Sequence, residues 1–480
     1  MMNSMKKAKQ TRSEKDSLGT VKVPKDAYFG AFTVRAYNNF QISGITSPEI
    51  FMKSIGMVKL AALRANARLK LIPAKKAKAI EKAALEFVDG KFADSFITDV
   101  FQAGAGTSYN MNCNEVIANR ANEILKGKKG TYEHIHPNNH VNMAQSTNDT
   151  IPTASRLAVL MLHPELIDEI KKLEKSFDKL AKKHAKTIKV GRTHLQDAVP
   201  ITLGQEFDSY KEALQKSRKQ VEQQAKELDV LGIGGTAVGT GINTHPSYQK
   251  EIIKELSKLA KRKFRAGKNL TEMANNMNAF MNYSAALRSL AVNLLNICMD
   301  LKMMNMGPKA GLAEIVLPEV QPGSSIMPGK INPSIPESIE MVAFHVLGND
   351  KTIEMSCQRS NFELNVMCPI IMYNLVQSSQ ILSGGLRTLR EKCVDGIKVN
   401  EDHLNDLYEN SLATATALAP YVGYATTSDI VKQALKKGIS IREETKSRNL
   451  YTDKELNEIL SIKGTTKPRK INEKLIRKSQ

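Results

Sequence analysis

The sequence predicts a mainly all-α protein built around a bundle of long helices. Apolar residues recur at alternating spacings of four and three between residues 164 and 185, and a second heptad seam lies between residues 207 and 228. Hydrophobic residues make up 41% of the 480 residues, enough for a large core. Seams this long in a chain that is not fibrous are typical of helix bundles, which subunits can share. The seams consist of Leu166, Ile170, Leu173, Phe177 and Leu180, and of Phe207, Tyr210, Leu214, Val221 and Leu228.

The remaining segments are further helices and short polar stretches. Residues 1–25 are polar and are expected to be extended. Helical periodicity marks four more segments, 51–71, 74–87, 277–304 and 336–391. A smaller module near the end of the chain finishes in a basic tail. We therefore expect three parts, an N-terminal part (1–143), a central bundle (144–400) and a small helical C-terminal part (401–480).

Two polar segments precede predicted helices. Thr107 follows a run of small residues that lets the backbone approach a ligand, and it offers a hydroxyl at a helix start. Ser146, Thr147 and Asn148 place two hydroxyls and an amide side by side, a good cradle for a carboxylate. Helix capping would use the same residue types, so the pattern alone leaves binding and capping open at both places.

The turn between the two heptad seams carries Thr193 and His194. A lone histidine in a turn is usually structural, so His194 is a candidate only together with the other polar loops. The glycine-rich segment 232–241 follows a heptad-patterned helix, whereas a dinucleotide-binding fingerprint follows a buried strand. We interpret this segment as a tight passage between helices.

Residues 321–333 form the loop around which the other segments are organised. Two glycines and three prolines in these thirteen residues exclude a continuous helix or strand. The polar groups are the hydroxyls of Ser324 and Ser325, the cation of Lys330 and the amide of Asn332. This set suits a small anion, because a hydroxyl that removes a proton beside a carboxylate needs a cation to hold the growing charge. A turn-rich surface loop is the alternative for a lone Ser-Ser-Lys set.

The charge of the chain favours an anionic substrate over nucleic acid. Lys and Arg number 69 against 49 for Asp and Glu, a formal charge of +20. The lysines are scattered through the helices, only residues 6–9 and 463–478 are locally dense, and there is no Trp for base stacking. Nucleic acid is therefore not an expected partner, and the positive field would steer dicarboxylates toward a cationic cleft.

Cysteine usage and hydropathy favour a cytoplasmic protein. Five cysteines form no C-x-x-C pair, which fits reduced thiols. No apolar run reaches the roughly 18 residues of a spanning helix, so no membrane association is expected. Three histidines between residues 134 and 140 lack carboxylates or cysteines at ligand spacing, so no metal site is predicted.

The order of its motifs gives the chain a resemblance to the aspartase/fumarase superfamily, whose members eliminate fumarate from succinyl-type substrates. The motifs are Gly104–Asn114, Gln145–Asp149, Gly191–Glu206, Gly234–Asn243 and Gly323–Pro333. The resemblance extends from about residue 11 to about residue 462. It implies a mostly α, three-domain fold whose central long helices form the core of a homotetramer, with active sites that draw loops from three subunits.

The resemblance also implies a role for each polar loop. Ser324 is expected to take the Cβ proton, while Lys330 and Asn332 hold the carboxylate on which charge builds. The expected catalytic residues are Ser324, His194 and Lys330. The expected substrate-binding residues are Thr107, Ser146, Thr147, Asn148, Thr193, Ser325 and Asn332. No cofactor is expected, although a divalent cation such as Mg²⁺ could activate the protein.

Two branches of the superfamily compete for the assignment. Gly104–Ser108, Thr147 and Gly311–Glu314 resemble the branch that releases ammonia from L-aspartate. Gly234–Thr236 and Asn361–Asn365 resemble the class II hydratases, which interconvert L-malate and fumarate. We favour the ammonia-releasing branch, because its features lie nearer the expected site. A third hypothesis is a family member that has lost catalysis and serves as a structural or binding protein.

Overall fold

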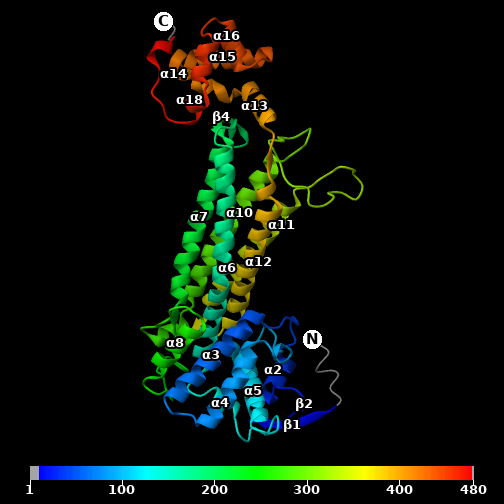
Figure 1. Ribbon diagram of the computed structural model, residues 1–480, viewed down its shortest axis with the longest axis vertical. Coiled ribbons are helices and arrows are strands. Elements are labelled where there is room, and N and C mark those ends of the chain that lie inside the picture. The colour runs from blue at the N-terminus through cyan, green and yellow to red at the C-terminus, as the bar shows by residue number, and fades with distance from the viewer. Residues whose placement is uncertain (1–9, 478–480) are drawn as a thin grey trace. The chain divides into compact units, whose positions relative to one another are not determined.

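The chain forms two compact units in a computed structural model that describes residues 10–477 (Figure 1). Unit 1 comprises Met1–Ile167, Lys219–Ala291 and Ala343–Ser383, and unit 2 comprises Asp168–Arg218, Val292–Val342 and Gly384–Gln480. Five long helices contribute residues to both units. They are α6 (Thr147–Lys183), α7 (Leu203–Leu228), α10 (Asn278–Met304), α11 (Ser334–Cys357) and α12 (Cys368–Lys392). The predicted all-α class is therefore confirmed, and the division into three parts stays a prediction.

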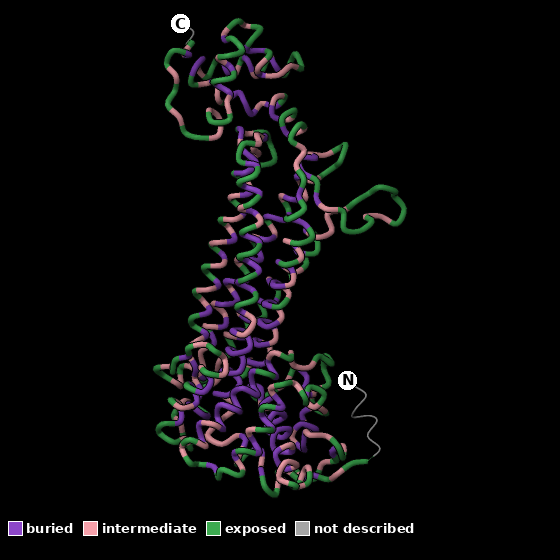
Figure 2. Tube along the Cα trace, in the orientation of Figure 1, coloured by how far each residue is buried: buried purple, intermediate pink, exposed green. Residues whose placement is uncertain are grey.

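Both heptad seams are buried along α6 and α7, as predicted (Figure 2). Within unit 2 the ring of Phe177 lies 6.2 Å from that of Phe207 and 5.6 Å from that of Tyr210, measured between centroids. The hydroxyl of Tyr210 donates to Asp300 Oδ2 of α10 at 3.0 Å. Burying an apolar side chain of this size stabilises the fold by about 1.5–3 kcal/mol, so the seams supply much of the stability of the long helices.

Unit 1 is organised around helix α3 (Glu49–Arg68), which packs against α4 (Ala74–Val88) and α8 (Tyr248–Leu259). Arg68 at the end of α3 forms ion pairs with Glu251 and Glu255 of α8, each at 2.5 Å. The helices predicted at 51–71 and 74–87 are confirmed as α3 and α4. The elements wholly within unit 1 are β1 (Thr11–Asp16), β2 (Gly19–Pro24), α2 (Ala31–Asn39), α3 (Glu49–Arg68), α4 (Ala74–Val88), η1 (Ala93–Ser95), η2 (Gly104–Gly106), α5 (Thr107–Ile124), η3 (Pro137–Val141), β5 (Val230–Leu231), α8 (Tyr248–Leu259), β6 (Arg265–Ala266), α9 (Leu270–Asn275), β8 (Ser360–Asn361) and β9 (Leu364–Asn365).

The strands of unit 1 are short. The extended N-terminal segment forms the antiparallel hairpin β1–β2, with Asp16 opposite Gly19, which its polar sequence did not indicate. The glycine-rich segment 232–241 follows β5, a strand of only two residues, and leads to α8. The interpretation of this segment as a passage between helices is confirmed, because a dinucleotide fold requires a longer buried strand.

Unit 2 combines the hairpin of β3 (Ile188–Thr193) and β4 (Gln196–Thr202) with a cluster of C-terminal helices. Val190 of β3 packs against Tyr408 and Ala413, which anchors the base of the hairpin on this cluster. The elements wholly within unit 2 are β3 (Ile188–Thr193), β4 (Gln196–Thr202), β7 (Ile315–Val316), η4 (Val394–Gly396), β10 (Lys398–Val399), α13 (Glu401–Asn410), η5 (Leu412–Ala417), α14 (Ala419–Val422), α15 (Tyr424–Lys437), α16 (Ile441–Ser447), α17 (Asp453–Ile459), α18 (Ile462–Thr466) and η6 (Glu473–Leu475).

Much of the basic tail is folded onto the C-terminal helices. The guanidinium of Arg469 lies over the ring of Tyr421 and donates to the carbonyl of Ile459. Leu475 is buried, and Arg477 pairs with Glu455 at 2.9 Å. These arginines serve packing within unit 2. The lysines at 6–9 and Lys478 lie outside the described residues.

The cysteines of the chain are free thiols. Four of them are buried, and burial raises the pKa of each of the five thiols, to about 12 for Cys113 and Cys368. Such thiols are poor nucleophiles at neutral pH. Among residues 10–477, no helix combines the length and the apolar character needed to cross a membrane.

Candidate active site

Helix α5 of unit 1 begins at Thr107 after three residues with positive φ. The φ angles of Gly104, Ala105 and Gly106 are 71°, 57° and 96°. A Cβ added to Gly106 would lie 3.0 Å from Cγ2 of Ile151, so this turn touches the first turns of α6. The Thr107 hydroxyl donates to the Gly104 carbonyl at 2.6 Å. The helix start is confirmed, and it lies beside the start of α6.

The start of α6 presents the second set of predicted site residues. Ser146 Oγ accepts from the Asn148 N–H at 3.2 Å, and the Asn148 amide donates to the carbonyl of Ala237 at 2.8 Å. Thr147 Oγ1 accepts from Asn110 Nδ2 of α5 at 3.1 Å. Because Thr147 Oγ1 is an acceptor in this bond, its own proton remains for donation elsewhere. Unit 1 therefore brings Thr107, Ser146, Thr147 and Asn148 to neighbouring helix starts.

A buried carboxylate, that of Asp149, holds this region together. Its Oδ1 accepts from the Ser146 N–H, and its Oδ2 accepts from the N–H groups of Gly234 and Thr236, all between 2.9 and 3.0 Å. Burial raises the pKa of Asp149, and the three donors oppose that rise. Two residues of the segment that resembles the hydratases therefore contact the residue after Asn148, so this segment also lies close to the predicted substrate-binding residues.

The hairpin β3–β4 of unit 2 carries Thr193 and His194 at its tip. Thr193 pairs with Gln196, so His194 and Leu195 form a two-residue turn with φ angles of 54° and 61°. Positive φ at both positions is what a type I′ hairpin turn requires. Both Thr193 and His194 are exposed to solvent. The turn was predicted, and the strands that project it were not.

A buried ion cluster anchors this hairpin. Glu314 has no exposed surface, and its carboxylate pairs with Arg192 Nη1 at 2.6 Å and with Lys189 Nζ at 2.9 Å. Lys189 also pairs with Glu206 at 2.5 Å. Burial is the main cause that raises the pKa of Glu206, and the Glu314 charge adds to it. Since Arg192 immediately precedes Thr193, the cluster fixes the strand that ends at the tip.

Sequence reasoning missed the role of Glu314. A signal was present, because Glu314 is the one charged residue between Leu312–Ala313 and Ile315–Val316. A charge in an apolar stretch requires a buried partner. Its partners, however, come from a hairpin more than a hundred residues earlier in the chain, as in the Arg192 contact with a separation of 122 residues.

The loop 321–333 is closed at its neck by two hydrogen bonds, one between backbone groups and one from a side chain. The Gly323 N–H donates to the Lys330 carbonyl at 2.9 Å, and Asn332 Nδ2 donates to the Gly323 carbonyl at 2.8 Å. A Cβ at Gly323 would lie 2.7 Å from the Asn332 nitrogen, so only glycine fits there. At the far end, Gly329 has a φ of 74°. The predicted loop is confirmed, and Asn332 is one of the groups that hold it shut.

Inside this loop, Ser324 receives two backbone donors. Its Oγ accepts from the N–H of Met327 at 2.9 Å and from the N–H of Ile326 at 3.2 Å. A hollow of about 440 Å³ lies at the loop and is lined by residues that include Ser324, Gly329 and Lys330. Ser325 and Lys330 are exposed, and Ser324 is half-buried. Within unit 2, Ser324 and Lys330 therefore share one hollow.

The structure supplies no cluster of metal ligands in its described part. Between residues 10 and 477, no three His, Cys, Asp or Glu side chains gather as a metal ion would require. His136 Nδ1 accepts from the N–H of Asn138, and His140 Nδ1 accepts from the N–H of His136. These ring nitrogens serve the local turn. Activation by a divalent cation stays a prediction.

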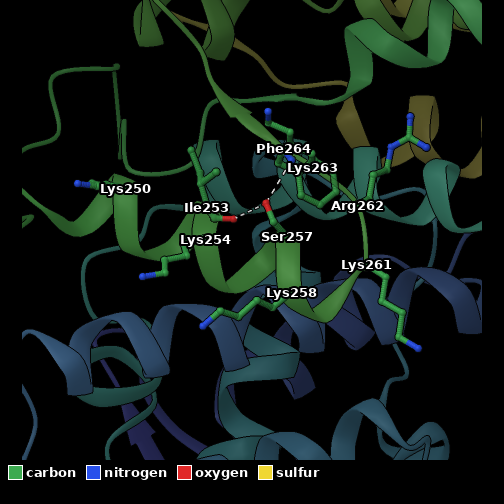
Figure 3. A pocket seen from close by; sticks show the side chains of 9 residues that line it. All are labelled: Lys250, Ile253, Lys254, Ser257, Lys258, Lys261, Arg262, Lys263 and Phe264. Carbon is green, nitrogen blue, oxygen red and sulfur yellow. Dashed lines mark hydrogen bonds between the residues drawn. The ribbon is translucent and has the colours of Figure 1, made fainter.

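A second hollow, of about 580 Å³, lies along α8 in unit 1 (Figure 3). Its cationic side chains point outward in different directions and do not converge on one point. Ser257 is its only hydroxyl, and it donates to the Ile253 carbonyl and accepts from the Phe264 N–H. The lining residues offer neither a base nor a convergent carboxylate cradle, so this hollow is not the candidate site.

The family of the chain follows from two matches. A family described as lyase matches residues 19–348, and one described as fumarase C C-terminus matches residues 415–466. The chain therefore belongs to the aspartase/fumarase superfamily, a family of lyases, as its motifs predicted.

Relatives of known name narrow the comparison. The chain is 45% identical over 457 residues to an aspartate ammonia-lyase from a Bacillus species. The matched residues cover 95% of this chain and 98% of that protein. It is 40% identical to a class II fumarate hydratase from Bacillus subtilis, covering 95% of this chain and 99% of that protein. Among solved structures, a fumarate lyase:delta crystallin from Brucella melitensis bound to cobalt matches with a TM-score of 0.91 and 44% identity, covering 94% of this chain and 99% of that one.

The ion cluster behind the hairpin leads to a prediction. In Glu314→Gln the charge of Arg192 loses its partner and Lys189 keeps only Glu206, which should destabilise unit 2 by about 3–5 kcal/mol. Backbone amides of the hairpin, residues 188–202, should exchange with deuterium faster. Glu319→Gln is the matched control, because Glu319 is exposed and lies in the same segment. Unchanged exchange in Glu314→Gln would show that the cluster does not anchor the hairpin.

Proposed function

We propose that this chain is an aspartate ammonia-lyase, which converts L-aspartate reversibly to fumarate and ammonia. The similarity to the Bacillus aspartate ammonia-lyase, at 45% identity over almost the full length of both chains, supports the assignment. The polar loops agree with it chemically. They supply hydroxyls, amides and one cation, and an elimination through a carbanion needs such donors to stabilise developing negative charge.

The observation that carries the proposal is the pair of backbone donors on Ser324. A serine hydroxyl is a very weak acid, so it acts as a base only where its alkoxide is stabilised. N–H groups of Ile326 and Met327 point at Oγ from 3.2 and 2.9 Å. This arrangement is an oxyanion hole built for the serine itself. Lys330 lines the same hollow as Ser324, and its ammonium adds positive charge to the loop.

The elimination then proceeds in two steps. The alkoxide of Ser324 takes the proton from Cβ, and the electron pair of that C–H bond moves into the neighbouring carboxylate, giving an aci-carboxylate. Lys330 and Asn332 bind this carboxylate as its charge rises. The electron pair returns to form the double bond between Cα and Cβ. The bond from Cα to the protonated amino group breaks, and its electron pair leaves with nitrogen as neutral ammonia.

The other loops bind the substrate. Thr107, Ser146, Thr147, Asn148 and Ser325 contact its carboxylates and amino group, in keeping with the hydroxyls and amides at the starts of α5 and α6. Thr193 and His194 of another copy of the chain bind a carboxylate of the substrate. Their exposure at a hairpin tip suits this role. The proposed assembly is a homotetramer with shared sites. The free thiols fit a cytoplasmic protein.

The main competing function is class II fumarate hydratase. It is favoured by the 40% identity to the Bacillus subtilis hydratase and by the contact of Gly234 and Thr236 with Asp149. Both reactions pass through removal of a Cβ proton, so Ser324 would act alike in each. The two functions differ only in the leaving group on Cα.

Substrate choice is tested by adding L-aspartate and L-malate separately and following fumarate by its ultraviolet absorbance. We expect fumarate from L-aspartate, with ammonia released in equal amount. Fumarate from L-malate alone would assign the chain to the hydratases. No reaction with either substrate would support the non-catalytic hypothesis.

Sharing of sites is tested with two inactive variants, Ser324→Ala and His194→Ala. If the two side chains of one site come from different copies, mixed and reassembled tetramers should regain activity at about a quarter of their sites. Each variant unfolded and reassembled alone is the control and should stay inactive. Absence of recovery in mixed tetramers that have formed would contradict the shared-site proposal.

A further inference from the structure

A buried lysine lies behind the substrate loops of unit 1. Lys59 of α3 has 1% of its surface exposed. Its Nζ donates to three amide oxygens, those of Asn110 at 2.6 Å, Asn142 at 2.9 Å and Gln145 at 2.9 Å. One acceptor belongs to α5, and the other two lie in the turn between η3 and α6. Lys59 therefore joins α3 and α5 to the turn that leads into α6.

The number of acceptors matches the charged form of the side chain. An ammonium has three N–H donors, one for each amide oxygen, whereas a neutral amine has two and a lone pair. Deprotonation of Lys59 would leave one of the three amide oxygens without a donor. The lone pair of the neutral amine would then face that oxygen. A buried oxygen without a donor is unfavourable, so the three acceptors favour the charged lysine.

One of the three amides connects the lysine to a predicted substrate-binding residue. Asn110 accepts from Lys59 through Oδ1 and donates to Thr147 Oγ1 through Nδ2, at 3.1 Å. The Asn110 amide also donates to Asn142 Oδ1 at 3.2 Å, which fixes its orientation. Because the Thr147 oxygen accepts the bond from Asn110, its own proton remains to be donated to a ligand. A positive charge on Lys59 polarises the amide and makes each following donor in the chain stronger.

The surroundings of Lys59 bring its pKa close to neutral pH. Burial lowers its pKa to about 8, and Cys113 of α5 and Asp149 of α6 act in the opposite direction. The Cys113 thiol is itself buried, with its pKa raised to about 12, so it remains neutral in this range. Asp149 is occupied by three backbone donors and does not contact Lys59 directly. The partners that touch Lys59 are thus neutral amides.

We infer that Lys59 is a positioning residue for substrate binding: its charge, passed through the Asn110 amide, directs and strengthens the Thr147 hydroxyl as a donor to a substrate carboxylate. The role rests on the proposed function in one respect, that Thr147 contacts the substrate. The amide link gives Lys59 an effect on binding without contact with the ligand.

A double-mutant cycle separates this role from a merely structural one. The probe is succinate, a dicarboxylate that cannot lose ammonia or water, and its binding is measured by calorimetry at neutral pH. Lys59→Met and Thr147→Val should each weaken binding by roughly tenfold to a hundredfold. If Lys59 acts through Thr147, the double variant should bind about as weakly as Thr147→Val alone. If the loss of succinate affinity in the double variant equals the product of the losses in the two single variants, the inference is wrong.

The control for the lysine change is Lys53→Met. Lys53 lies on the same helix but is exposed, so its removal should leave succinate binding unchanged. Equal losses in both lysine variants would mean that net charge is the cause, and would likewise overturn the inference.

The pH dependence of binding gives a second test, which needs no change at Lys59. Both carboxylates of succinate are ionised between about pH 7 and 9, so the ligand does not titrate there. As pH rises through about 8, Lys59 loses its proton and succinate should bind several-fold less tightly. Thr147→Val should lose this dependence, and Thr147→Ser should keep it. A wild-type slope that persists in Thr147→Val would show that another group causes it.

These measurements remain informative whatever the reaction is. A chain that binds succinate but releases no fumarate from L-aspartate would refute the proposed function and leave the cycle valid. An active ammonia-lyase whose Lys59 and Thr147 effects multiply would keep its function and lose this inference.

Discussion

Charged side chains without access to water hold the irregular segments of both units in place. A buried charge is tolerated only when hydrogen bonds or an opposite charge replace its water, and removal of one partner costs several kcal/mol. In unit 1, Lys59 donates to three amide oxygens, and Asp149 accepts from three backbone N–H groups. In unit 2, Glu314 lies between Lys189 and Arg192. Each of these groups joins segments that are distant in the sequence, so each fixes a loop that its own sequence would leave free.

The buried charges and the accessible polar groups have different parts in the proposed chemistry. The groups that would meet the substrate, such as Thr147, His194 and Lys330, are half-buried or exposed, while the charges behind them are buried. Donors that are oriented before the substrate arrives need no reorganisation when charge develops, which is the main source of electrostatic catalysis. Ser324 shows the principle most directly, because the two N–H groups that would stabilise its alkoxide belong to the loop that carries it.

Local patterns predicted much of this architecture. The heptad seams, the helix starts at Thr107 and Thr147, and the loop 321–333 all follow from residues that are neighbours in the chain. The buried charges could not be assigned from local pattern, because their partners lie far away, as with Glu314 and Arg192. Lys59 gave a usable signal, since it falls four residues after Ile55 and eight after Phe51 on one apolar helix face, and both of those residues are buried. The choice between aspartate and malate turns on side chains around one leaving group. The motifs of the ammonia-releasing branch favoured aspartate, whereas relatives of both branches match almost the full chain.

In the proposed function, Ser324 removes a proton from Cβ of the substrate. The most direct measurement is exchange of the Cβ hydrogen of L-aspartate with deuterated water, followed by nuclear magnetic resonance. The unmodified protein and the control Ser338→Ala, which changes an exposed serine of α11, should both exchange this hydrogen. Ser324→Ala should still bind succinate, but it should not exchange the Cβ hydrogen of L-aspartate. Exchange in Ser324→Ala at a rate close to that of the unmodified protein would contradict the account, because another group would then be the base.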